Sequence, residues 1–202
     1  MIYILDLLGT FVFAITGGLK AVKYNLDILG IIVLSIIVGV GGGVIRDLIL
    51  GYNPPNVFRD EIYLIVCLAA GLLVFFFSYL IERKIRFLLI FDAVGLGVFA
   101  LIGANRAASY DMGPLGVIMM GTITATGGGL LRDVLVREIP IIIKKDFYAS
   151  AALVGCIFYL IADHYQLPNL IKIVMPILIT TSLRLTAIIF NINLPKTKNI
   201  SS

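Results

Sequence analysis

Three consecutive glycines stand inside a long apolar stretch, an arginine and an aspartate follow them, and the whole arrangement occurs twice. The first copy contains Gly41, Gly42, Gly43, Arg46 and Asp47, and the second contains Gly127, Gly128, Gly129, Arg132 and Asp133. Each residue of the second copy lies 86 positions after its counterpart. At that offset residues 6–60 and 92–146 are identical at 19 of 55 positions. One supersecondary unit has therefore been duplicated.

The segments around these motifs are too apolar for a water-soluble protein. Of the 202 residues, 60% are hydrophobic and only 14% are charged, and the mean hydropathy is +1.06. Uncharged runs such as residues 62–81 are long enough to cross a hydrocarbon core of about 30 Å. Because a continuous apolar run must satisfy its backbone hydrogen bonds internally, we expect an all-α polytopic membrane protein.

The apolar runs predict seven transmembrane helices. They cover residues 2–19, 28–50, 61–81, 87–105, 114–136, 147–163 and 167–191. Three spans fall in each repeat, and because three is odd the second repeat enters the membrane from the opposite side, so the repeats are inverted. We divide the chain into a first three-helix repeat (1–86), a second, inverted one (87–166), a seventh helix (167–192) and a cytoplasmic tail (193–202).

Basic residues predict the orientation of these spans. Eleven lie on one side, namely Lys20, Lys23, Arg83, Lys84, Arg86, Arg132, Arg137, Lys144, Lys145, Lys196 and Lys198, and three on the other, Arg46, Arg59 and Arg106. The positive-inside rule then places the N-terminus outside and the C-terminus in the cytoplasm. Basic loops next to the spans account for the net charge of +4, so no nucleic-acid partner is expected, and these loops would attract membrane lipids with anionic headgroups.

The glycine triplets predict a local change in two helices. Glycine inside a helix costs about 1 kcal/mol relative to alanine, so each triplet is expected to bend or unwind its span. An opened backbone beside a water-filled cavity could offer its carbonyl groups to a cation. The alternative is close helix packing, because Gly39-x-x-x-Gly43 and Ala125-x-x-x-Gly129 are small-xxx-small patterns.

Polar residues accompany the triplets at helical spacing. The fifth span carries Thr122, Thr126, Gly129 and Asp133 on one face, and the second repeats that spacing with Ser35, Gly39, Gly42 and Arg46. Hydroxyl groups can replace part of an ion's water shell, although a membrane-helix threonine often bonds the carbonyl four residues earlier in its own helix.

The charged residues inside the spans are expected to be paired or to reach water, because an unpaired charge in hydrocarbon is costly. The Arg–Asp pairs of both motifs fit either a role beside a pathway or a salt-bridged lock. Asp6 and Asp92 stand near the starts of their spans, where a helix N-terminus favours a carboxylate; ion binding is the alternative. Lys20 and Arg106 lie near span ends, where snorkelling is the default. Arg184 could face a lumen or an interface.

Enzymatic sites are not expected. His164 is the sole histidine, so neither a metal cluster nor a catalytic triad is available. Gly95-x-Gly97-x-x-Ala100 imitates a dinucleotide motif, but it lies within an apolar span and no strand precedes it. We predict no catalytic residue, no bound metal and no cofactor.

The two glycine motifs, on a plan of three helices plus three plus one, resemble those of the prokaryotic trimeric intracellular cation (TRIC) channel family, which has also been grouped under a predicted glycine-transporter label. The resemblance covers residues 1 to about 192. It implies a homotrimer in a prokaryotic cell membrane, with a pore in each protomer that is lined by the broken second and fifth helices and passes potassium and sodium. By matching position, the two triplets would form the kinks, and Arg46, Asp47, Arg132 and Asp133 the charges beside the pore.

Two functions follow from these features. The first is a potassium-permeable monovalent cation channel in which Ser35, Thr122, Thr126 and freed backbone carbonyls partly replace hydration water. The alternative is a secondary transporter of a small solute such as glycine, whose carboxylate would meet a half-helix N-terminus while Asp47 or Asp133 met its ammonium group.

Overall fold

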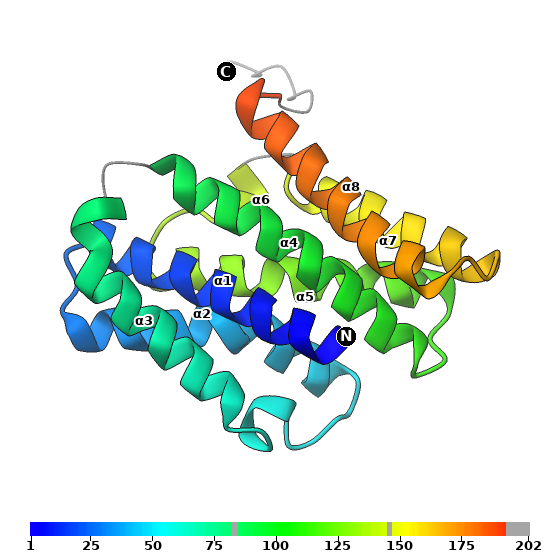
Figure 1. Ribbon diagram of the computed structural model, residues 1–202, viewed down its shortest axis with the longest axis horizontal. Helices are drawn as coiled ribbons and strands as arrows, with labels where there is room; N and C mark the ends of the chain where they lie inside the picture. The colour runs from blue at the N-terminus through cyan, green and yellow to red at the C-terminus, as the bar shows by residue number, and fades with distance from the viewer. Residues whose placement is uncertain (82–84, 145–146, 193–202) are drawn as a thin grey trace, which may run out of the picture.

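The computed structural model describes residues 1–81, 85–144 and 147–192 of the chain, and this part is helical (Figure 1). Its helices are α1 (Ile2–Lys23), α2 (Ile28–Ile49), α3 (Ile62–Ile81), α4 (Ile85–Ala108), α5 (Pro114–Leu135), α6 (Ile141–Lys144), α7 (Ala149–His164) and α8 (Asn169–Ile189), with a 3₁₀ turn η1 (Asn56–Phe58). Each predicted span overlaps one of the long helices, whereas η1 and α6 lie between the predicted spans.

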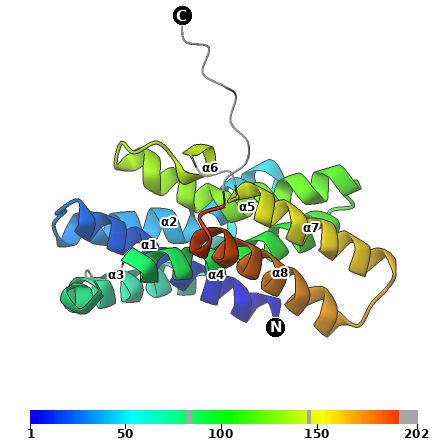
Figure 2. The same ribbon diagram turned by 90° about the horizontal axis from the view of Figure 1, so that it is seen from above.

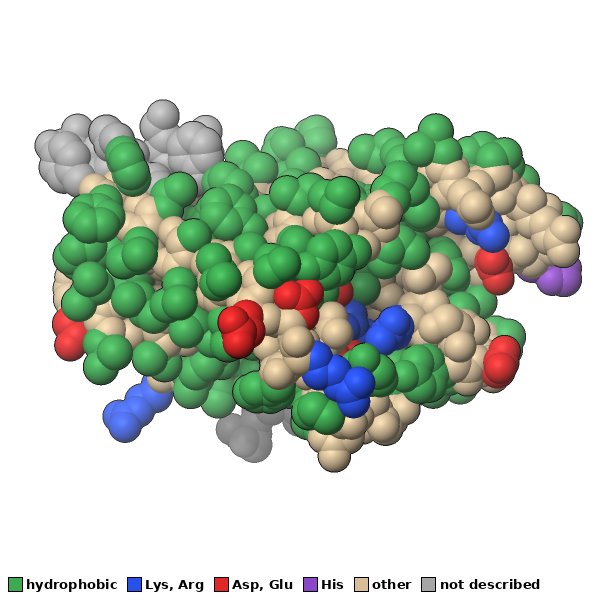
Figure 3. Space-filling model, turned by 60° about the horizontal axis from the view of Figure 1, so that its bottom comes forward, with side chains coloured by type: hydrophobic (Ala, Val, Ile, Leu, Met, Phe, Trp, Pro, Cys, Tyr) green, Lys and Arg blue, Asp and Glu red, His purple; other side chains and the backbone are tan. Residues whose placement is uncertain are grey.

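By length and composition, five of the described helices are able to cross a membrane: α1, α2, α4, α5 and α8. The described parts of α3 and α7 are also apolar but shorter. The outer surface of the protein is apolar as well, with Phe76 72% exposed and Leu115 70% exposed, and Figure 3 shows hydrophobic side chains over most of one face. Such a surface suits lipid rather than water, and the chain is an integral membrane protein.

The long helices form two bundles related by the sequence repeat. Helices α1, α2 and α3 pack against one another, as do α4, α5 and α7. The bundles meet mainly where α1 packs on α4 and α2 packs on α5, so the largest contacts between the bundles join equivalent helices. Helix α8 packs on the second bundle, against α4 and α7 (Figures 1 and 2).

Local sequence explains where α2 and α5 begin. The side chain of Asp27 caps α2, because its Oδ1 accepts a hydrogen bond from the Gly30 amide at 2.7 Å. Helix α5 starts with Pro114, whose fixed φ angle and missing amide proton suit the first turn. Both starts set the register in which the glycine triplets reach the contact between the bundles.

The prediction that the triplets unwind their helices is wrong. Helices α2 and α5 both continue through them without interruption. The triplets instead lie where the two helices cross: a Cβ on Gly42 would collide with the Thr124 carbonyl oxygen, and one on Gly128 would lie 2.5 Å from the Val38 oxygen. Close backbone packing and intact hydrogen bonds therefore outweigh the roughly 1 kcal/mol that each helical glycine costs.

Candidate ion pathway

The first charged cluster, Asp6, Arg46 and Asp47, lies inside the first bundle. Nε of Arg46 donates to Oδ1 of Asp47 at 2.8 Å, and its Nη1 lies 3.9 Å from Oδ2 of Asp6. Two groups from the chain after α2 complete the cluster. The Tyr63 hydroxyl donates to Oδ2 of Asp6 at 3.0 Å, and the backbone amide of Asn56 donates to Oδ2 of Asp47 at 2.9 Å.

The second charged cluster, Asp92, Arg132 and Asp133, repeats this arrangement in the second bundle. Nη1 of Arg132 lies 2.7 Å from Oδ1 of Asp92, and its Nε lies 3.1 Å from Oδ1 of Asp133. The backbone amide of Ile141 donates to Oδ2 of Asp133 at 2.9 Å, as Asn56 does in the first cluster. Asp6 and Asp92 therefore neutralise an arginine of the neighbouring helix, and their predicted role at helix N-termini is wrong.

The two clusters differ in their access to solvent. A hollow of about 480 Å³ lies against Asp6 and Arg46, with Tyr52, Asn105 and Arg106 also in its lining. Figure 3 shows basic and acidic side chains gathered around a depression at this end of the molecule. In contrast, Asp92, Arg132 and Asp133 are all 0% exposed. The first cluster thus borders a hollow, and the second is enclosed.

Lys20 covers the enclosed cluster. Its Nζ lies 3.2 Å from Oδ1 of Asp133 and 2.8 Å from Oε2 of Glu138. The side chain is only 6% exposed, so the prediction that Lys20 snorkels to the interface is wrong. Its counterpart in the repeat, Arg106, lines the hollow and lies over the ring of Tyr52, with 5.1 Å between the guanidinium carbon and the ring centroid. Lys20 thus covers the second cluster, whereas Arg106 borders the hollow beside the first.

Electrostatics stabilise this closure outside the membrane spans. Hydrogen bonds from Lys20, and then from Tyr24 and Lys23, lower the pKa of Glu138 to about 2. The hydrogen bond to Glu138 correspondingly raises the pKa of Tyr24. Glu138 is therefore ionised at neutral pH and holds Lys20 in place.

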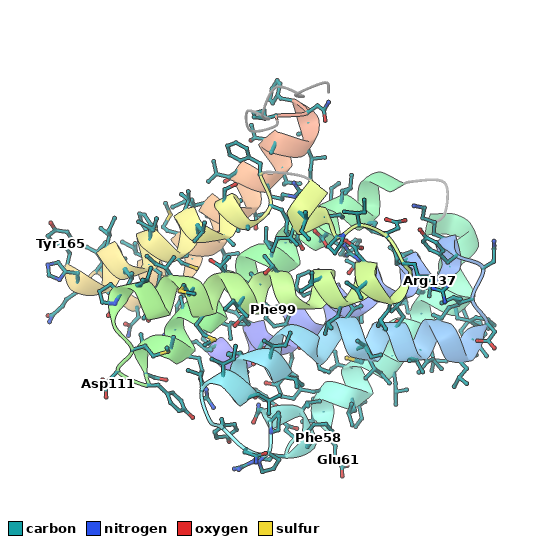
Figure 4. All side chains as sticks on the ribbon, turned by 180° about the vertical axis from the view of Figure 1, so that it is seen from behind. Phe58, Glu61, Phe99, Asp111, Arg137 and Tyr165 are labelled. Carbon is teal, nitrogen blue, oxygen red and sulfur yellow. The ribbon has the colours of Figure 1, made fainter. Side chains whose placement is uncertain are left out.

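A pair of phenylalanines separates the two clusters. Phe13 and Phe99 are equivalent in the repeat, are 0% and 1% exposed, and pack with ring centroids 5.2 Å apart. Phe13 lies between Asp6 and Lys20 on α1, about 10 Å along the helix from each, and Phe99 holds the same place on α4, midway along the molecule in Figure 4. Phe99 also lines a cavity of about 20 Å³ beside the first cluster, room for about one water molecule.

The hydroxyl groups that were predicted to line the pathway, those of Ser35, Thr122 and Thr126, differ in their hydrogen bonding. Thr122 and Thr126 donate to the carbonyl groups of Ile118 and Thr122 at 2.9 and 2.8 Å, as is common in membrane helices. Ser35 is fully buried, and its hydroxyl has no hydrogen-bond partner. It packs inside the first bundle, where a Cβ on Gly18 would lie 2.8 Å from its oxygen.

Several elements of the site were missed from the sequence. The Phe13–Phe99 pair was not predicted as part of the site, although two large rings at one repeat position were a signal that they meet on the pseudo-two-fold axis. Tyr63 and Tyr148 differ by 85 positions rather than 86, so alignment at a fixed offset did not pair them. Each comes from the third helix of its bundle or the turn before it.

Comparisons with known proteins agree with the duplicated architecture. The family model described as "Glycine transporter" matches residues 3–79 and 89–164, one match for each repeat. The UPF0126 inner membrane protein YadS of Escherichia coli K12 is 39% identical over 197 residues, which cover 96% of this chain and 95% of that protein. A TRIC trimeric intracellular cation channel orthologue from Rhodobacter sphaeroides superposes with a TM-score of 0.91 at 37% identity, over 95% of this chain and 98% of the other.

This chain belongs to the prokaryotic TRIC family. A second member, a prokaryotic TRIC channel crystallised in 0.5 M KCl, superposes with a TM-score of 0.89 at 35% identity and covers 96% of this chain. A UPF0126 membrane protein of Deinococcus radiodurans is 41% identical over 164 residues, 80% of this chain and 76% of that protein. The resemblance inferred from the glycine motifs is confirmed; the matching family model is described as a glycine transporter, and the solved relatives are described as cation channels.

Proposed function

We propose that this protein is a potassium-permeable monovalent cation channel with a pathway inside each protomer. The observation that carries the proposal is the stacking of two equivalent Arg–Asp clusters on either side of the Phe13–Phe99 pair, with only the first cluster open to a hollow. Its relatives include proteins described as TRIC cation channels. Inverted repeats that meet around polar groups near the membrane midplane are typical of transport pathways.

The proposed route follows the contact between the bundles. A cation enters the hollow, where Asp6 and Asp47 supply negative charge, and reaches the constriction at the two phenylalanines. It then passes the second cluster and leaves when Lys20 releases Asp133. The glycine triplets bring α2 and α5 together beside this route, with Thr122 and Thr126 as the hydroxyl groups next to them, while Ser35 lies inside the first bundle. The present packing corresponds to a closed state, because the rings touch and Lys20 is paired.

Further features of the proposal concern the assembly and its orientation. We place the hollow outside the cell and Lys20 on the cytoplasmic side, as the distribution of basic residues favours. A homotrimer is supported by the relative described as trimeric. Sodium is expected to pass as well as potassium, because no ring of backbone carbonyls suited to strict selection is found in the part of the chain that the structure describes.

Planar-bilayer recording of the purified protein tests this function. We expect unitary potassium currents of picoampere size. Phe99→Ala removes half of the constriction and is expected to raise the unitary conductance or the open probability. Phe76→Ala is the matched control, because it makes the same change on a residue that is 72% exposed. Absence of current, or the same effect from both variants, would contradict the proposed route.

A second candidate is a secondary transporter of a small zwitterion such as glycine. The description of the family model favours it, and so does a cavity that is open at one end only, as alternating access requires. Saturable glycine uptake by proteoliposomes that carry no unitary current would establish this function instead of the channel.

A further inference from the structure

Arg184 stands apart from the ion pairs that hold the second cluster together. It comes from α8, is 2% exposed, and its Nε has no hydrogen-bond partner. Its guanidinium carbon lies 4.9 Å from the centroid of the Tyr148 ring, a cation–π contact that supplies no counter-charge. Among the described residues, Arg184 makes none of the ion pairs of this region.

No carboxylate of the described residues lies within ion-pair distance of Arg184, and Asp92 acts on it only from farther away. Asp92 is engaged by Arg132 at 2.7 Å, and Asp133 is shared by Arg132 and Lys20. Three carboxylates, Asp92, Asp133 and Glu138, accompany the three buried cations Lys20, Arg132 and Arg184, but the ion pairs engage only Lys20 and Arg132. A buried arginine without a direct ion-pair partner is costly in a membrane protein, so its site favours an anion.

The structure provides a place for this anion. A pocket of about 120 Å³ lies beside Arg184 and is lined by side chains of α4, α6 and the end of α8, among them Leu89, Ile141 and Ile188. Except for Arg184 and Asn191, its lining is aliphatic. Arg184 lies five residues before the end of α8, about 7.5 Å along the helix. That end projects from the bundle in Figure 1, with Ile189 and Phe190 more than 70% exposed.

We propose that this pocket binds the phosphate group of an anionic phospholipid. Arginine binds phosphate oxygens through charge-assisted and often bidentate hydrogen bonds. The aliphatic walls and the exposed apolar end of α8 suit the chain that follows a lipid phosphate, whereas a free inorganic anion would gain nothing from them. Basic pockets between membrane helices are known to take lipid headgroups. The lipid phosphate then neutralises Arg184 and ties α8 to α4 and α6.

A fluorescence experiment tests this site without measuring transport. The chain has no tryptophan, so Ile192→Trp places a single reporter in the pocket lining at a residue that is 42% exposed. The protein is reconstituted in phosphatidylcholine, and phosphatidylglycerol with brominated acyl chains is titrated in as the quencher. We expect half-maximal quenching at about tenfold less phosphatidylglycerol than brominated phosphatidylcholine, as one charge-assisted contact would give.

Variants in this background decide the assignment. Arg184→Gln is expected to abolish the preference for phosphatidylglycerol. Arg184→Lys keeps the positive charge and should retain part of this preference, so the proposal can still be tested if the glutamine variant does not fold. Lys172→Gln removes one positive charge near the other end of α8 and should change nothing. Inorganic phosphate that displaces the quencher would assign the pocket to free phosphate, and no displacement assigns it to lipid. A preference that is absent, or that survives Arg184→Gln, overturns the proposal.

Discussion

Two adjacent glycines of the first triplet are expected to respond in opposite ways to the same substitution. A Cβ on Gly42 would collide with the carbonyl oxygen of Thr124, whereas the nearest atom to a Cβ on Gly43 is Nη2 of Arg46 at 3.7 Å, an ordinary contact. Gly42→Ala therefore forces the α2–α5 crossing apart, and Gly43→Ala does not.

The magnitudes follow from two opposing terms. Alanine gains about 1 kcal/mol over glycine inside a helix. Overpacking costs about 1 to 3 kcal/mol, and the upper end applies to Gly42 because the obstacle is a backbone atom that is fixed in a helix. Gly42→Ala should lose about 2 kcal/mol of folding free energy and Gly43→Ala should gain about 1. For a chain of this size, these changes lower the melting temperature by about 4–8 °C and raise it by about 2–4 °C.

Thermal unfolding in detergent, followed by far-ultraviolet circular dichroism, measures both variants. Gly128→Ala repeats the test from the other helix, because its Cβ would lie 2.5 Å from the Val38 carbonyl oxygen. Equal shifts for Gly42→Ala and Gly43→Ala would refute the argument that close packing holds these glycines. Two increases would favour an opened helix that alanine restores.

Two further variants probe the second cluster. Asp92→Asn leaves Arg132 buried without its main partner and should cost about 3–5 kcal/mol, whereas Asp163→Asn breaks an exposed pair and should cost at most about 1 kcal/mol; the same melting experiment compares them, and equal losses would argue against a buried ion pair. Because the pKa of Glu138 is lowered from 4.5 to about 2, its stabilisation is complete above pH 4.5 and is lost as the pH falls towards 2. Glu138→Gln should flatten this part of the melting temperature–pH profile, and an unchanged profile would show that Glu138 does not hold Lys20.

The sequence was sufficient for the architecture because hydrophobic length and repeat spacing are properties of segments. The helices, their division into two related bundles and the family could all be predicted in this way. Whether the helices unwind at the triplets could not be predicted, because the helix propensity of Gly42 is a local property, whereas the Thr124 carbonyl that it contacts comes from the other repeat. The prediction that Lys20 snorkels was wrong for the same reason, because its partners, Asp133 and Glu138, lie more than a hundred residues away in the sequence.

Helix α8 has no counterpart in the first repeat, so the two halves of the protein are not equivalent. A duplicated chain could in principle behave identically in both directions, but α8 packs on the second bundle, and Lys20 faces Glu138 where its counterpart Arg106 faces a tyrosine ring. We therefore expect the two ends of the proposed route to present unequal energy barriers to a cation. Current–voltage curves recorded from uniformly oriented channels in symmetric salt should rectify.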